Sequence, residues 1–485
     1  MRTVIEIVEG TRSGKLGVTS LVEEYVGRVR QKKALNAVTY LAENEALQDA
    51  RRLDALPLPE RRGRLFGVPI LVKDAICTRD LPTTSGSRIL NRASAEGPRP
   101  YLPPYDATVI ERLRAEGALV LGKANMDEFA MGSSNETSSY GPVKNPLDET
   151  RVPGGSSGGS AAGVAAELAP VALGSDTGGS IRQPASFCGI VGVKPTFGRV
   201  SRYGLIAFAS SLDQIGPMTP DVRSAARLLE VMAGPDGRDS TASTAPVEGY
   251  EAACELGLAG LRFGVPEEYF AAGLDPEVRR VIDAAIEKVK NAGGVLVPVS
   301  LPHTHYGVST YYVLATAEAS SNLSRFDGVR FGLRVEAPQG GLQALYTESR
   351  ARGFGPEVQR RILLGTYVLS SGFYDAYYGK AQRVRTLIAR DFERAFEQVD
   401  CLLAPTSPTV AFRLGERSQD PLAMYMADVY TLPASLAGVP ALSLPVGKAT
   451  DRGQSLPVGL QVMAPLNGEA TMFRAAAAIE SLCGA

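Results

Sequence analysis

Two glycine-rich, serine-bearing segments stand out in this sequence: Gly154-Gly155-Ser156-Ser157-Gly158-Gly159-Ser160 and Asp176-Thr177-Gly178-Gly179-Ser180-Ile181-Arg182-Gln183-Pro184. Glycine lacks a Cβ, so its backbone can approach a substrate closely and successive N–H groups can converge on one oxygen. Such a turn can hold both a nucleophile and an oxyanion hole. Most glycine and serine runs are flexible linkers, but these two lie within apolar sequence that we expect to be buried.

Helix and strand patterns alternate around the two segments. We expect a helix over 160–168 and a strand over 171–173, which places both serines at the ends of core elements. Residues 106–116 carry one apolar helical stripe, and a buried strand is expected over 118–121. This order predicts an αβ unit upstream of the serines.

A second αβ unit is clearer. Expected strands over 261–265 and 295–299 flank a helix that begins with Asp275 as N-cap and Pro276 in its first turn. The repeated order of strand and helix predicts the α/β class, with a large mixed, mostly parallel β-sheet covered by helices on both faces. Further short strands and a last helix are expected over 401–403, 441–444, 459–462 and 469–482.

Charge and cysteine usage limit the function classes. The chain has 51 Lys and Arg residues against 52 Asp and Glu residues, so it lacks the excess of positive charge that is typical of nucleic-acid-binding proteins. No apolar run long enough to span a membrane and no signal peptide are recognised, so we expect a cytoplasmic protein. The five scattered cysteines predict neither disulfides nor a metal site.

A histidine-based triad is disfavoured. Gly154 to Gly158 match the G-x-S-x-G pattern, but a polar segment ending in proline precedes them where a strand is required. The two histidines, His303 and His305, lie in a turn and are expected to be structural or exposed. No S-x-x-K tetrad and no phosphate-binding Gly-Lys-Ser/Thr sequence occurs.

Without histidine, a serine nucleophile needs another base. A lysine can act as that base when burial lowers its pKa and leaves the amine neutral. Lys73 and Lys194 each end an apolar run. Residue patterns alone leave both of them open as the base.

The stretch from Gly154 to Thr196 resembles the amidase signature, and the similarity extends over nearly the whole chain. This resemblance implies an amidase-signature fold in a single domain over 1–485. Its N-terminal helical segment would span about 1–60 and its signature core about 61–235. The remaining part, 236–485, would complete the sheet and the substrate pocket.

The same resemblance implies roles for individual residues. Ser180 would be the nucleophile, Lys73 the base, and Ser156 the serine that bridges them, next to a cis peptide bond. The backbone N–H groups that would stabilise the oxyanion belong to Thr177, Gly178, Gly179 and Ser180. No metal is implied.

Three further motifs, 125–134, 326–332 and 364–378, resemble the A subunits of tRNA-dependent amidotransferases, one branch of this family. Two departures are visible. Phe326 and Phe331 stand where tyrosine is more usual, and the loop at 93–102 is longer than usual. The longer loop increases the separation of Lys73 from the first serine segment, although the residues flanking Lys73 keep the family pattern.

Membership of that branch implies that Ser180 attacks the side-chain amide of glutamine and releases ammonia. Subunits B and C of a heterotrimer would be the partners. ATP and magnesium would bind in a partner subunit, which would hold most of the tRNA, and no cofactor would bind in this chain. The ammonia would convert Glu-tRNA(Gln), Asp-tRNA(Asn) or both.

Glutamine carries two opposite charges, so its pocket should offer a cation and an anion. The resemblance places Arg361 on the carboxylate, Asp428 on the ammonium and Tyr312 beside them. A stand-alone amidase with the same triad is the alternative. An inactive scaffold is a third, which the joint presence of Lys73, Ser156 and Ser180 opposes.

Overall fold

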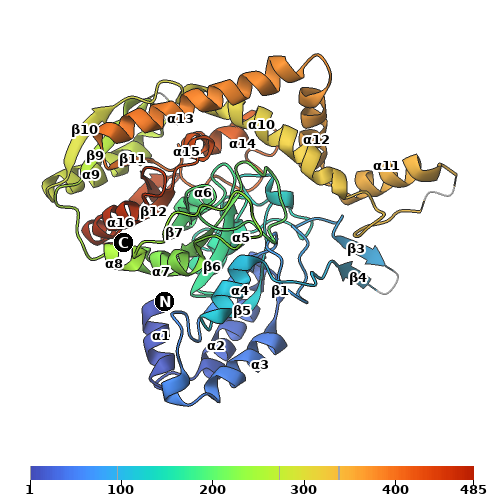
Figure 1. The fold of residues 1–485 in the computed structure, drawn as a ribbon, viewed down its shortest axis with the longest axis horizontal. Helices are drawn as coiled ribbons and strands as arrows, with labels where there is room; N and C mark the ends of the chain where they lie inside the picture. Colours follow the sequence, from blue (N-terminus) through green and yellow to red (C-terminus); the bar gives the residue numbers. More distant parts are fainter. Residues whose placement is uncertain (1, 95–96, 272, 337–338, 485) are drawn as a thin grey trace.

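The computed structural model describes residues 2–94, 97–271, 273–336 and 339–484. Within them, one sheet of 11 strands runs through the molecule in the order β1-β5-β2-β6-β8-β7-β12-β13-β11-β9-β10 (Figure 1). Its strands are β1 Val38–Leu41, β2 Pro69–Lys73, β5 Leu119–Ala124, β6 Val171–Asp176, β7 Val191–Lys194, β8 Gln214–Thr219, β9 Arg262–Pro266, β10 Val295–Val299, β11 Cys401–Pro405, β12 Ala441–Asp451 and β13 Gln454–Met463.

The sheet is mixed, as predicted, but its parallel pairs are confined to two wings. Strands β5, β2 and β6 run parallel to one another, as do β11, β9 and β10. The central pairs from β6 to β11 are antiparallel. The expectation of mostly parallel pairing was therefore too strong. Strands β12 and β13 form a hairpin around Arg452 and Gly453, and so short a connection permits only antiparallel pairing.

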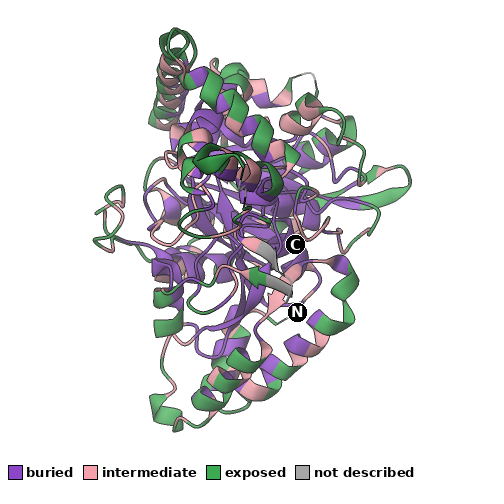
Figure 2. Ribbon diagram, turned by 90° about the vertical axis from the view of Figure 1, so that its right-hand side faces the viewer, coloured by how far each residue is buried: buried purple, intermediate pink, exposed green. Residues whose placement is uncertain are grey.

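Helices cover both faces of the sheet, as predicted. Every residue of β2, β5 and β6 is buried, and successive side chains of a strand point to opposite faces. Figure 2 shows this buried centre beneath exposed helices. The helices are α1 Val4–Arg12, α2 Val18–Gln31, α3 Glu43–Asp54, α4 Thr108–Ala115, α5 Gly158–Ala165, α6 Arg182–Cys188, α7 Val222–Met232, α8 Tyr250–Ala253, α9 Pro276–Asn291, α10 Gly307–Asn322, α11 Gly341–Gly353, α12 Pro356–Leu369, α13 Lys380–Gln398, α14 Pro421–Tyr425, α15 Leu432–Ala437 and α16 Glu469–Cys483.

Both predicted αβ units are present. Helix α4 leads into β5, and β9, α9 and β10 follow in the expected order. Asp275 caps α9 by accepting hydrogen bonds from the N–H groups of Glu277 and Val278, and Pro276 occupies the first turn. The expected helix at 160–168 begins two residues earlier, at Gly158, and ends at Ala165.

The longer loop at 93–102 contains a separate two-stranded hairpin, β3 Asn91–Ser94 and β4 Gly97–Pro100. Residues 95–96 between the strands lie outside the described residues. All five cysteines are free thiols. Within the described ranges, no helix combines the length and apolar character that a membrane crossing requires.

Candidate active site

Parallel pairing of β2 with β6 brings the two serine segments and Lys73 together. Lys73 is the last residue of β2, and the second segment begins at Asp176, the last residue of β6. Because the carboxyl ends of parallel strands share one edge of the sheet, both emerge at the same place. The first segment leads into α5, so its serines lie at the start of that helix.

Lys73 is fully buried and contacts the bridging serine of the predicted triad. Its Nζ lies 2.7 Å from Ser156 Oγ, 2.7 Å from Ser157 Oγ and 3.1 Å from the carbonyl oxygen of Ser175. Lys194, the other candidate base, donates to the carbonyl oxygen of Pro195 at 2.9 Å and contacts no serine hydroxyl among the described residues. The geometry thus favours Lys73 over Lys194.

Burial lowers the pKa of Lys73 to about 7, outweighing the buried carboxylates of Asp127, Asp176 and Asp213, which raise it. Burial, together with Arg182, lowers the pKa of Lys194 to about 7 as well. Both amines can therefore be neutral near physiological pH. Contact with a serine, not the pKa, distinguishes the two lysines.

Ser157 completes the surroundings of the amine and was missed by the sequence analysis. A neutral amine has two hydrogens and one lone pair. The carbonyl of Ser175 can only accept, and Ser157 Oγ donates its own hydrogen to that carbonyl at 3.2 Å, so it accepts from Lys73. Both amine hydrogens are then used, and the lone pair faces the hydroxyl of Ser156.

Ser180 lies in the loop between β6 and α6 and is the more accessible serine. Its residue is 7% exposed, whereas Ser156 is fully buried. Its hydroxyl has no hydrogen-bond partner among the described residues. Its carbonyl accepts from the N–H of Ser157 at 3.0 Å, which ties the two serine segments together. The Gly155–Ser156 peptide bond is cis, as expected.

The loop before Ser180 holds open N–H donors. In the described part of the chain, none of the N–H groups of Thr177, Gly178, Gly179 and Ser180 donates a hydrogen bond. Gly179 has a φ of 147°, and a Cβ there would lie 2.2 Å from Thr431 Oγ1. Both its backbone conformation and this close contact require glycine at position 179.

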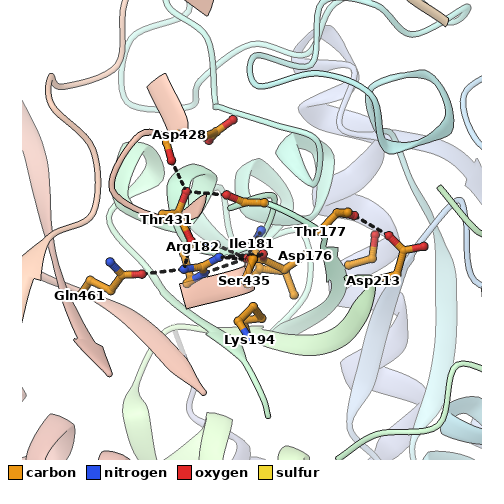
Figure 3. A network of polar contacts seen from close by, with 12 residues as sticks. Asp176, Thr177, Ile181, Arg182, Lys194, Asp213, Asp428, Thr431, Ser435 and Gln461 are labelled. Atoms are coloured by element: carbon orange, nitrogen blue, oxygen red, sulfur yellow. Dashed lines mark hydrogen bonds and ion pairs between the residues drawn. The ribbon is translucent and has the colours of Figure 1, made fainter. Parts of the chain in front are cut away.

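A buried ion pair holds this loop (Figure 3). Asp176 and Arg182 are both fully buried, and Arg182 Nη2 lies 2.9 Å from Asp176 Oδ1. Asp176 also accepts from the N–H of Ile181 at 3.2 Å, next to Ser180. Burial raises the pKa of Asp176, but Arg182, Lys194 and the N–H of Ile181 together outweigh burial and hold that pKa below its usual value. Both residues lie in the second glycine-rich segment, yet the sequence analysis assigned them no role.

A cavity of about 370 Å³ lies between the loop at 132–137 and the start of α12, and Arg361 is among the residues that line it. Arg361 is buried on α12, and its Nε donates to Glu357 Oε1 at 2.8 Å. Its guanidinium carbon lies 5.1 Å from the ring centre of Tyr312 and 5.5 Å from that of Tyr425. Its Nη atoms have no hydrogen-bond partner among the described residues.

Asp428 supplies a buried carboxyl group near the same cavity. Its Oδ2 accepts from Ser133 Oγ at 2.5 Å, and Ser133 lines the cavity. Its Oδ1 is buried, has no hydrogen-bond partner in the described part of the chain, and lies 3.0 Å from the position of a Cβ on Gly179. Burial raises the pKa of Asp428 to about 7, although Arg361 lowers it.

The three predicted glutamine-binding residues thus surround one region. The rings of Tyr312 and Tyr425 stack with their centres 3.8 Å apart. Tyr312 and Asp428, however, are not among the residues that line the cavity, and neither are Lys73, Ser156 and Ser180. Of the predicted site residues, Arg361 alone lines this cavity.

The histidines play no part in this arrangement, as predicted. The ring of His303 contacts Asp391 on α13, with Nδ1 3.0 Å from Oδ1. The ring of His305 contacts the carbonyl oxygen of Pro302 at 2.6 Å. The first is structural and the second is exposed.

Comparison with known proteins shows the family of this chain. The amidase family model matches residues 20–473. The A subunit of a glutamyl-tRNA(Gln) amidotransferase from Acidobacterium capsulatum is 54% identical over 484 residues, which are 99% of each chain.

Two solved structures have similar folds. That of the glutamyl-tRNA(Gln) amidotransferase A subunit from Thermotoga maritima has 41% identity and a TM-score of 0.81, and the match covers 99% of this chain and 94% of that one. The native peptide amidase from Stenotrophomonas maltophilia has 31% identity and a TM-score of 0.81, over 100% and 97% of the two chains. The chain belongs to the amidase family, in which its sequence places it among the members named as A subunits of glutamyl-tRNA(Gln) amidotransferases.

Proposed function

We propose that this chain hydrolyses glutamine and supplies the ammonia as the A subunit of a tRNA-dependent amidotransferase. The charge arrangement beside the loop of Gly178 and Gly179 carries the proposal. Arg361 offers a fixed cation with unpaired Nη groups among the described residues, and Asp428 offers a buried carboxylate with one unpaired oxygen. These groups match the carboxylate and the ammonium of a free amino acid.

In the proposed reaction, Ser180 Oγ attacks the side-chain carbonyl of glutamine while its proton passes through Ser156 to the neutral amine of Lys73. The open N–H groups of Thr177, Gly178, Gly179 and Ser180 stabilise the resulting oxyanion. Collapse of this intermediate returns the proton to the leaving nitrogen and releases ammonia. Water then attacks the γ-glutamyl ester, releases glutamate and restores Ser180.

Partner subunits would use the ammonia. The relatives are named as A subunits of amidotransferases that serve a tRNA, so we assign B and C subunits as partners in a heterotrimer. ATP, magnesium and most of the tRNA would bind in a partner, and this chain would hold no cofactor. The products would be Gln-tRNA(Gln), Asn-tRNA(Asn) or both, formed in the cytoplasm.

Purification of the chain with and without its partners tests the function. The complete complex should hydrolyse glutamine and amidate a charged tRNA, whereas the isolated chain should hydrolyse glutamine at least roughly tenfold more slowly, because we expect partner binding to order the loops around the site. Ammonia release is the measurement. Efficient hydrolysis of varied small amides by the isolated chain would instead favour a stand-alone amidase. The similarity to a peptide amidase is the reason for testing this alternative.

Arg361→Ala should raise the KM for glutamine by roughly tenfold to 100-fold and change kcat little, because it removes binding that substrate and transition state share. The neighbouring Arg360→Ala is the matched control. Arg360 lines the same cavity, but its side chain is 48% exposed and contacts Glu357, so its loss should leave KM nearly unchanged. Steady-state kinetics with glutamine measure both. An unchanged KM for Arg361→Ala would remove this residue from the binding site.

A further inference from the structure

The side chain of Gln183 bridges the two loops that carry the proposed catalytic and substrate-binding groups. Its Oε1 accepts from the N–H of Gly155 at 3.0 Å, and its Nε2 donates to the carbonyl oxygen of Ser133 at 2.8 Å. Gln183 is fully buried in the first turn of α6. The two partners fix the orientation of the amide. In the reverse orientation, Nε2 would face the N–H of Gly155, donor against donor, and Oε1 would face the carbonyl of Ser133, acceptor against acceptor.

Each end of this bridge leads to a functional group. Gly155 immediately precedes Ser156, the proposed bridging serine. The hydroxyl of Ser133 donates a hydrogen bond to Asp428, whose other carboxylate oxygen is buried and has no partner within the described ranges. One side chain therefore connects the proposed ammonium site with the path of the catalytic proton.

The two loops also pack closely against one shared carboxylate, that of Asp127. A Cβ on Gly155 would lie 2.0 Å from Asp127 Oδ2, and a Cβ on Gly132 would lie 2.3 Å from the carboxyl carbon of Asp127. The same carboxylate accepts from the N–H groups of Asn135 and Thr137. A displacement of the loop at 132–137 would therefore shift the turn before Ser156.

We propose that Gln183 is a positioning residue that couples occupation of the ammonium site to the alignment of Ser156. An α-ammonium group on Asp428 fixes this carboxylate, and with it Ser133 and the carbonyl that Gln183 holds. Gln183 in turn holds the peptide N–H that precedes the bridging serine. This inference rests on the proposed function. It predicts that a substrate without an ammonium group loses kcat as well as affinity.

The test compares glutamine with 4-carbamoylbutanoate, which lacks only the ammonium group, using the assembled amidotransferase. Wild-type enzyme should show a kcat roughly tenfold higher for glutamine. In Gln183→Met, which keeps the volume but makes neither hydrogen bond, the ratio of the two kcat values should fall towards one, and any coupling that remains passes through the packing against Asp127. The ratio of the two KM values should persist, because Asp428 still binds the ammonium.

Gln183→Glu gives a second readout if the methionine variant does not fold. A neutral glutamic acid can still donate to Ser133 and accept from Gly155, whereas its ionised form has no donor. The kcat of this variant relative to wild type should therefore fall as the pH rises. The control is Gln214→Met on β8, another fully buried amide, whose Nε2 donates to the carbonyl of Asp213. It should retain the wild-type kcat ratio.

Distinct outcomes would overturn the coupling and the function. Equal loss of kcat on both substrates in Gln183→Met, or a constant relative kcat of Gln183→Glu across pH, would reduce Gln183 to a structural role. Equal kcat values of the wild-type enzyme for the two substrates would exclude coupling. Failure of the wild-type complex to hydrolyse glutamine would overturn the proposed function itself, and this inference with it.

Discussion

Ser180→Ala should abolish glutamine hydrolysis by the assembled enzyme and leave the fold intact. Removal of a nucleophile that acts together with its base costs a factor on the order of 10⁶ in kcat in a comparable serine enzyme. The hydroxyl of Ser180 has no hydrogen-bond partner among the described residues, so its loss breaks no contact that holds the fold. Ammonia release measures the activity, and thermal unfolding measures the stability.

Ser160→Ala is the matched control for this change. Ser160 belongs to the first glycine-rich segment and is fully buried, but its hydroxyl donates to the carbonyl of Leu173 at 2.9 Å. Its replacement should cost about 1 kcal/mol of stability and keep most of the activity. Retained glutamine hydrolysis in Ser180→Ala would show that Ser180 is not the nucleophile and that another hydroxyl attacks the amide.

Local sequence predicted those parts of the site that lie within a few consecutive residues. The glycines around Ser156 and Ser180 identify tight turns, and the apolar residues between them identify a core strand and helix. Caps such as Asp275 mark helix ends for the same reason, since the hydrogen bonds they form are local. These features need no knowledge of the tertiary structure.

Groups that meet through the sheet could not be predicted from residue patterns. Lys73 and Lys194 end similar strands, and only the parallel pairing of β2 with β6 decides which of them reaches Ser156. The hairpin of β12 and β13 was missed because its turn lies between two strands that were expected to be shorter.

Positioning residues were hidden for a different reason. Ser157 and Gln183 stand inside the two glycine-rich segments, but the partners that give them a role are distant in sequence: Lys73 for Ser157, and Ser133 for Gln183. A glutamine or a second serine in such a segment has no distinctive spacing. Its role becomes visible only when donors and acceptors are counted in the folded molecule.

Lys73→Met should lower kcat by a factor on the order of 10³, because it removes the proposed base and keeps the volume of the side chain. Lys194→Met is the matched control, since Lys194 is equally buried and its pKa is also lowered to about 7. It should retain activity. Neither variant should be less stable than wild type. Each buried lysine has a pKa of about 7 in the folded chain and 10.5 in the unfolded chain, so between these values the unfolded chain binds one more proton, which favours unfolding. Replacement by methionine removes this penalty.

The pH dependence separates the base from the substrate site. Below about pH 7 the amine of Lys73 is protonated and cannot accept a proton, so kcat should rise with pH and level off above this value. Asp428 must be ionised to bind the ammonium, and its pKa is also raised to about 7, so KM should fall over the same range. Lys73→Met should lose the rise in kcat and keep the fall in KM, and Lys194→Met should keep both. The reverse result would make Lys194 the base, because only loss of the proton acceptor can remove the pH dependence of kcat while glutamine still binds.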